Sequence, residues 1–205
     1  MIRGLADLEI TPSDPLITAF AVYLSELKKW NRAYSLTSLK DDRDIIVKHF
    51  FDSLLFLRVI PSGRERLADV GSGAGFPGLP LALVRPDIEV ALVEPSRKKC
   101  AFLRHITRKL GTGNVEVLES RAEEIRDRRF DCIVTRALFS IAELAKRSGH
   151  LLERGGCFIL SKGPKLKREL ETLPETLEVT TAYAALPEGA GHRILVVAKT
   201  RVTRA

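Results

Sequence analysis

The sequence predicts an α/β protein with a mostly parallel, seven-stranded sheet, helices on both faces of that sheet and a helical segment before it. Three observations support this prediction. After residue 60, hydrophobic runs of strand length alternate with helical stretches, which is the pattern of parallel strands joined by crossover helices. The first run ends in a glycine-rich turn that leads into a helix. Only residues 186–191 separate the last two runs, and this spacing predicts an antiparallel hairpin because it is too short for a crossover helix.

The first 60 residues have the periodicity of helices. Residues 12–34 predict an amphipathic helix, with Thr11 or Ser13 placed to cap it. Residues 41–57 predict a second helix whose first turn is acidic, as the helix dipole favours. We therefore expect residues 1–60 to form a helical cap that packs on a main unit of residues 61–205, the two making one structural unit.

The remaining elements follow in order along the main unit. Residues 152–156 have the composition of a helix C-terminus, a glycine stop and a new strand. Strand-like runs occur at 66–70, 88–93, 114–118, 130–135, 156–161, 177–184 and 193–199, and helical stretches at 77–85, 96–110, 138–152 and 164–171.

The glycine-rich turn after the first strand has the features of a nucleotide site. It reads Asp69-Val-Gly-Ser-Gly-Ala-Gly-Phe-Pro-Gly, and Gly71, Gly73 and Gly75 remove side chains where the backbone must turn sharply and approach a ligand. Glu94 ends the next apolar run, where a carboxylate can accept both hydroxyl groups of a ribose. The chain is therefore predicted to bind a nucleoside-containing cofactor.

Two kinds of cofactor fit this turn. Gly73, Gly75 and Gly78 match the spacing G-x-G-x-x-G, so a dinucleotide remains open. Asp69 argues against a dinucleotide, because its carboxylate would repel a pyrophosphate and attract the ammonium and sulfonium groups of S-adenosylmethionine. No tyrosine of the chain has a lysine four residues later, as the commonest dehydrogenase chemistry on this fold requires. The sequence favours S-adenosylmethionine, and the simplest alternative is a turn that only closes a βα unit.

Composition limits the class of protein and suggests a partner. The net charge of +7 comes entirely from residues 61–205, because residues 1–60 contain eight basic and eight acidic residues. A basic surface favours a polyanion. No apolar run reaches the ~18 residues of a membrane helix, the start of the chain lacks an apolar signal region, and three scattered cysteines predict neither a zinc site nor a disulfide framework. We expect a cytoplasmic protein with no metal. The basic clusters are Arg97, Lys98, Lys99, Arg104, Arg108 and Lys109; Lys162, Lys165, Lys167 and Arg168; and Lys199, Arg201 and Arg204.

The order of elements resembles the seven-stranded class I methyltransferases, which have a Rossmann-like sheet. The chain also contains six distinctive blocks, at residues 29–38, 47–54, 69–80, 120–123, 135–137 and 160–163. These blocks resemble, more narrowly, the bacterial family that methylates guanosine N7 in 16S rRNA, the glucose-inhibited division protein B family. One position departs from that family, because Ser35 stands where its members usually carry asparagine.

The resemblance implies methyl transfer from S-adenosylmethionine to a guanosine N7 in 16S rRNA or a small-subunit precursor. We also expect a monomer that does not contact membranes. Arg136 and Lys162 are the candidate catalytic residues, because they end the fourth and fifth strands at the expected site. A methyltransferase for a small molecule or another RNA, and a dinucleotide-binding protein, remain as alternatives. The candidate cofactor-binding residues are Asp69, Gly71, Gly73, Gly75, Phe76, Glu94, Ala122, Glu123 and Arg136.

Residues 135–138 also bear on the reaction. Enzymes that methylate exocyclic amines typically carry Asn/Asp-Pro-Pro-aromatic after this strand, and the chain reads Thr-Arg-Ala-Leu. Guanine N7 offers a lone pair and has no proton to lose, so alignment matters more there than a base. Elsewhere, His49 and Asp52 are expected to brace the cap as a local pair, with an RNA-facing surface as the alternative. Trp30 and Tyr34 are expected in the core, and Arg193 is a lesser RNA-contact candidate.

Overall fold

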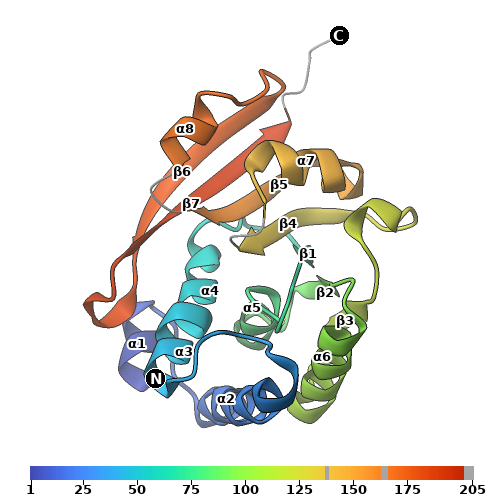
Figure 1. Cartoon of the computed structure of the whole chain (residues 1–205). Coiled ribbons are helices and arrows are strands. Elements are labelled where there is room, and N and C mark those ends of the chain that lie inside the picture. Colours follow the sequence, from blue (N-terminus) through green and yellow to red (C-terminus); the bar gives the residue numbers. More distant parts are fainter. Residues whose placement is uncertain (137–138, 163–165, 201–205) are drawn as a thin grey trace.

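The structure, a computed structural model, describes residues 1–136, 139–162 and 166–200. Its centre is a seven-stranded sheet with the order β3-β2-β1-β4-β5-β7-β6 (Figure 1). β1 to β5 pair in parallel, and β7 lies antiparallel between β5 and β6. The predicted α/β class and its C-terminal antiparallel hairpin are confirmed. The strands are β1 (Arg66–Val70), β2 (Glu89–Val93), β3 (Val115–Leu118), β4 (Phe130–Arg136), β5 (Leu152–Lys162), β6 (Leu177–Ala185) and β7 (His192–Thr200).

Helices cover both faces of the sheet, and each face has its own hydrophobic cluster. On β2, Val90 and Leu92 point to the cluster shared with α5 (Gly78–Val84) and α6 (Arg97–Leu110). The alternate residues Ala91 and Val93 point to the cluster shared with α7 (Ile141–Ser148) and α8 (Leu166–Leu170). Figure 1 shows α7 and α8 on the opposite side of the sheet from α5 and α6. This burial on both faces explains why the central strands are continuous hydrophobic runs.

The N-terminal helices belong to the α5–α6 side. They are α1 (Ile2–Asp7), α2 (Asp14–Tyr34) and α3 (Asp42–Ile45), and α3 continues through a π-helical turn (Ile46–Phe51) and α4 (Asp52–Leu54) into a 3₁₀ turn (Leu55–Arg58). Phe20, Tyr23 and Phe50 are fully buried in the same cluster as α5 and α6. The sequence does not predict α1, because a helix of six residues gives little periodicity. Gly4 of α1 lies so close to Phe51 that an added Cβ would come within 2.2 Å of its ring.

One predicted boundary is wrong. The predicted helix over 138–152 ends at Ser148, and β5 begins at Leu152, so residues 152–156 are a strand instead of a helix end. The reason is a pairing irregularity between β4 and β5 at this point, where Gly155 adopts a φ of 79°. Gly155 and Gly156, which resemble a helix stop in the sequence, lie at this irregularity of β5. The predicted first residue of this helix, Leu138, and the predicted positions Pro164 and Lys165 of the next one lie outside the described residues.

Candidate functional site

The glycine turn lies between β1 and α5, at the carboxyl edge of the parallel strands. The amides of Gly71 and Ser72 donate to the carbonyl of Val93, at 2.9 and 3.2 Å, so the turn is held against the end of β2. Gly75 has a φ of 97°, and an added Cβ would approach the Tyr23 hydroxyl oxygen to 2.6 Å. At Gly78 a Cβ would come within 2.8 Å of the Cβ of Asp69. Glycine is therefore required at Gly75 for its conformation and at both positions for close packing.

Asp69 is fully buried beneath the turn. Its Oδ2 accepts a hydrogen bond of 2.8 Å from the amide of Gly78, and its Oδ1 has no partner among the described residues. Burial raises the pKa of this carboxyl group to about 7, although the Gly78 amide and the charge of Arg136 act in the opposite direction. A buried carboxyl group with a free oxygen suits a cationic ligand group, which would supply the missing partner.

Glu94 lies directly after β2 and faces the same turn. Its Oε2 accepts from the amide of Gly73 at 2.9 Å, and its Oε1 accepts from the amide of Ser96 at 3.0 Å. The side chain is almost completely buried, and the ammonium of Lys99 lies 3.9 Å from Oε2. Each carboxylate oxygen keeps a further lone pair, so the group can hold the turn and still accept from ligand hydroxyl groups.

A cavity of about 230 Å³ opens beside this turn, at the carboxyl ends of β1 to β3. Three predicted residues, Gly71, Ala122 and Glu123, line it. The Glu123 carboxylate pairs with Arg147 at 2.5 Å, and the pKa of Glu123 is lowered, by hydrogen bonds above all. The walls are otherwise mostly apolar, so the cavity suits a flat heteroaromatic ring with a polar edge. The full lining is Val70, Gly71, Val93, Pro95, Ser120, Arg121, Ala122, Glu123, Phe139 and Arg147.

Arg136, at the end of β4, joins the sheet to the N-terminal helices. One terminal nitrogen donates to the carbonyl of Lys48 at 2.7 Å and to Asp52 Oδ2 at 3.3 Å, and the other donates to His49 Nδ1 at 2.7 Å. On the far side of Asp52, the Nε of Arg193 lies 2.8 Å from Oδ1. We call His49, Asp52, Arg136 and Arg193 the arginine cluster. His49 and Asp52, expected to brace the cap as a pair, both bind Arg136.

Burial and buried charge set the protonation of this cluster. Burial, followed by the charge of Arg136, lowers the pKa of His49 to about 4, so the ring is neutral near pH 7. Its Nδ1 accepts from Arg136, and its Nε2 therefore donates to Thr37 Oγ1 at 2.7 Å. Burial also raises the pKa of Asp52 and lowers that of Arg136, against the attraction between the two.

Phe76 lies at the centre of this region. Its ring stacks on His49 at 4.6 Å and on Tyr23 at 5.3 Å between ring centres. The guanidinium carbon of Arg136 lies 5.3 Å from the same ring centre. Tyr23 also donates from its hydroxyl to the carbonyl of Ala74 at 2.5 Å. The sequence does not predict Tyr23 as a residue of this region, because helical spacing marks it only as part of an apolar face.

Several other predicted residues are engaged within the protein. Lys162 donates to the carbonyl of Phe139 at 2.6 Å and pairs with Glu169 at 3.0 Å. On α6, Arg104 pairs with Glu119 at 2.7 Å and Lys109 with Glu26 at 2.5 Å. Trp30 packs against the core as expected, whereas Tyr34 is exposed. Lys165, Arg201 and Arg204 lie outside the described residues.

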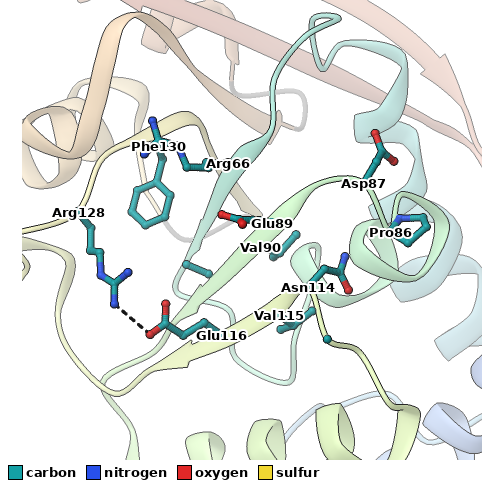
Figure 2. Close-up of a pocket in the computed structure, with 12 residues that line it drawn as sticks. Arg66, Pro86, Asp87, Glu89, Val90, Asn114, Val115, Glu116, Arg128 and Phe130 are labelled. Atoms are coloured by element: carbon teal, nitrogen blue, oxygen red, sulfur yellow. Dashed lines mark hydrogen bonds and ion pairs between the residues drawn. The ribbon is translucent and has the colours of Figure 1, made fainter.

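A larger cavity, of about 640 Å³, lies at the opposite edge of the sheet, around the amino ends of β1 to β3 (Figure 2). Its charged side chains are largely exposed, and several pair with each other or with neighbours. Arg128 pairs with Glu116 at 3.2 Å, as the dashed line in Figure 2 shows, and Arg66 pairs with Glu153 at 3.0 Å. None of the residues that line it is a predicted site residue. The smaller cavity therefore remains the candidate site.

Comparisons with known proteins find relatives that match most of the chain. The family model described as rRNA small subunit methyltransferase G matches residues 16–192. A ribosomal RNA small subunit methyltransferase G of Halorhodospira halophila is 40% identical over 200 residues, covering 97% of this chain and 95% of that protein. The protein of the same name from Neisseria meningitidis serogroup C is 41% identical over 172 residues, covering 84% and 80%.

Solved structures share the fold at low sequence identity. A cofactor-bound structure of Rv0187 from MTB is similar with a TM-score of 0.62 and 17% identity, covering 91% of each chain. Precorrin-6y C5,15-methyltransferase from Geobacter metallireducens is similar with a TM-score of 0.53 and 17% identity, covering 82% of this chain and 92% of that one. Among the described residues, no helix is both long enough and apolar enough to cross a membrane.

Proposed function

Because the chain belongs to the rRNA small subunit methyltransferase G family, we propose that it transfers a methyl group from S-adenosylmethionine to N7 of a guanosine in 16S rRNA. The substrate is the rRNA itself or a precursor of the small subunit. One observation carries the proposal beyond the family: the glycine turn is held against Glu94 beside a cavity of about 230 Å³. This is the place where an α/β sheet binds a nucleoside.

Residues of the turn and of the strand ends beside it suit different parts of the cofactor. Asp69 Oδ1, which lacks a partner among the described residues, suits the ammonium of the methionine part. The amides of Gly71 and Gly73 suit its carboxylate, and Glu94 suits the ribose hydroxyl groups. Gly75 and Phe76 maintain the turn and its contact with the cap. Ala122 and Glu123 line the cavity for the adenine.

S-adenosylmethionine, when bound, supplies an electrophilic methyl group. The protein has to place guanine N7 in line with it and exclude water, because N7 has no proton to lose. His49 is neutral, but its Nδ1 already accepts from Arg136, so it is not a free base. This arrangement supports a target that needs no general base.

Arg136 is the better of the two candidate catalytic residues. Within the described residues its terminal nitrogens make three hydrogen bonds, which leaves two of the five guanidinium N–H donors for a ligand. These donors suit guanine O6, a phosphate or the cofactor carboxylate. Lys162 shares its charge with Glu169 and is the weaker candidate.

We also propose that residues 1–60 act as a cap and form one unit with residues 61–205. The burial of Phe20, Tyr23 and Phe50 in the cluster of α5 and α6 supports this arrangement. The protein is proposed to act in the cytoplasm as a monomer, without membrane contact.

The test incubates the protein with methyl-labelled S-adenosylmethionine and rRNA from cells that lack this enzyme, and then digests the RNA to nucleosides. Label in 7-methylguanosine is the expected result. Label in another nucleoside would reject the N7 target, and label only in a small molecule would favour the first alternative. The absence of any labelled product would favour a dinucleotide-binding protein.

A further inference from the structure

A basic groove runs along the C-terminal half of α2. One hollow, of about 500 Å³, is lined by Lys28, Asn31, Arg32, Leu39 and Lys40. A second, of about 420 Å³, shares Lys28 and Arg32 with the first. We call the two together the α2 groove. The second hollow is lined by Ala21, Leu24, Ser25, Lys28, Lys29, Arg32 and Asp42.

The charge of the α2 groove is strongly one-sided. Four of its lining residues are cationic and one, Asp42, is acidic. Asp42 pairs with Lys28 at the surface, where such pairs contribute little stability. Lys29, Arg32 and Lys40 form no ion pair with any described residue. Composition did not reveal this groove, because residues 1–60 have no net charge in total.

The wall opposite α2 is a hydrogen-bonded loop. The amide of Thr37 donates to Asn31 Oδ1 at 2.8 Å, which ties the loop to the helix. The amide of Leu39 donates to Thr37 Oγ1 at 3.2 Å, which fixes the next turn of the loop. The cations of the groove are therefore carried on a fixed backbone, so a ligand does not have to order it.

The same loop reaches the arginine cluster on its other side. Thr37 Oγ1 is 2.7 Å from His49 Nε2, and His49 Nδ1 accepts from Arg136 at 2.7 Å. A continuous set of hydrogen bonds thus runs from the groove wall to the end of β4. The groove and the arginine cluster therefore lie on two sides of one loop, and Arg136 of the cluster has donors that suit guanine O6 or a phosphate.

We propose that the α2 groove binds the sugar–phosphate backbone of the rRNA next to the target guanosine. This inference rests on the proposed function. Lys28 and Arg32 are four residues apart on one helix face, and such positions are neighbours along the helix. Lysine and arginine in a groove of mostly positive charge are the groups that bind a phosphate backbone.

The test compares Arg32→Glu and Lys40→Glu with Arg154→Glu, which makes the same charge change on an exposed residue near the start of β5, at the opposite edge of the sheet. Binding of a small-subunit rRNA fragment is measured by fluorescence anisotropy over a series of salt concentrations. Arg32→Glu and Lys40→Glu are expected to weaken binding about tenfold and to lower the salt slope by about one each. Arg154→Glu is expected to stay within about twofold of the unsubstituted protein.

Two further measurements make the result decisive. Asp42→Asn removes the acidic residue of the groove and is expected to tighten RNA binding by about twofold. S-adenosylmethionine affinity is expected to be unchanged in every variant. If Arg32→Glu lowers that affinity, RNA binding is measured with Lys40→Gln, a change on the exposed loop, in its place. RNA binding by both groove variants within twofold of Arg154→Glu would overturn the inference. A protein that forms no 7-methylguanosine even without substitution would overturn the proposed function instead.

Discussion

The two edges of the sheet differ in the state of their polar groups, and β2 shows the difference along a single strand. At its amino end, Glu89 is exposed and lines the larger cavity. Just past its carboxyl end, Glu94 is buried and holds the glycine turn. The larger cavity is bordered by exposed ion pairs, whereas the carboxyl edge has buried carboxyl groups with unused bonding capacity. Because burying such groups is costly unless they have partners, they mark a site better than cavity volume does.

The largest expected effect is on the free energy of unfolding, when a buried ion pair at one edge and an exposed ion pair at the other are each removed. Asp52→Ala would leave Arg136 and Arg193 without their shared buried carboxylate, and we expect a loss of about 3–5 kcal/mol in the free energy of unfolding. Glu116→Ala breaks the exposed pair with Arg128 and should cost less than about 1 kcal/mol. Urea unfolding of both variants measures the two losses. Equal losses would mean that the edges do not differ as described.

The next largest effect concerns cofactor affinity at the two ends of β2. Glu94→Ala is expected to weaken S-adenosylmethionine binding at least tenfold, because loss of a charged acceptor costs about 1.5–3 kcal/mol. Glu89→Ala, on the same strand, should leave the affinity unchanged. Isothermal titration calorimetry compares the two. Unchanged affinity in Glu94→Ala would remove Glu94 from the cofactor site.

Asp69 predicts a pH dependence that the exposed edge should lack. Its pKa of about 7 lies above the ordinary 3.8, so its contribution to stability is present below about pH 4 and is lost as the pH rises through about 7. A cationic ligand reverses this preference, because it favours the ionised carboxylate. S-adenosylmethionine affinity should therefore rise by up to about tenfold between about pH 6 and 7.5, with release of up to one proton.

The proton release is measured by calorimetry in buffers of different ionisation enthalpy. The charged groups that face Asp69 are Glu94 and Arg136, and the Tyr23 hydroxyl also lies near it, with a pKa raised mainly by burial. Asp69→Asn serves as the control, since it should abolish the proton release and leave the variant without cofactor more stable at pH 8. Proton release that persists in Asp69→Asn would assign the titration to another group.

The sequence predicts the sheet well, because its strands are buried on both faces and remain continuous hydrophobic runs. β1 begins and ends at the predicted residues. The predicted start of β5 is wrong, because Gly155 belongs to an irregularity in the pairing of β5 with β4, and β4 is distant from Gly155 in the sequence. Pairing between distant residues leaves no local pattern to read.

The same division applies to the site. Asp69, the glycines and Glu94 are adjacent to strand ends, so their position follows from the order of elements. The arginine cluster could not be predicted, because it joins Asp52, Arg136 and Arg193 from three separate elements. Its partners are single charged residues that have ordinary surface roles in most contexts. The α2 groove was hidden for a different reason, since its positive charge is cancelled elsewhere in the cap.

The smallest expected effect compares two helix ends, one near each edge. Ser35 caps the C-terminus of α2 with a φ of 51°, next to the loop that contacts the arginine cluster, and Gly111 caps the C-terminus of α6 with a φ of 67°. The left-handed conformation favours glycine or asparagine over serine. Ser35→Gly should therefore raise the free energy of unfolding by about 0.5–1 kcal/mol, and Gly111→Ser should lower it by a similar amount. An added Cβ at Gly111 meets nothing within 4 Å, so the second change tests conformation without a clash.

Urea unfolding measures the stability of both variants. Ser35→Ala serves as the control, because alanine keeps a Cβ and does not favour the left-handed backbone as glycine does. A gain in Ser35→Ala equal to that in Ser35→Gly would show that the serine side chain, and not the left-handed backbone, sets the cost at this position.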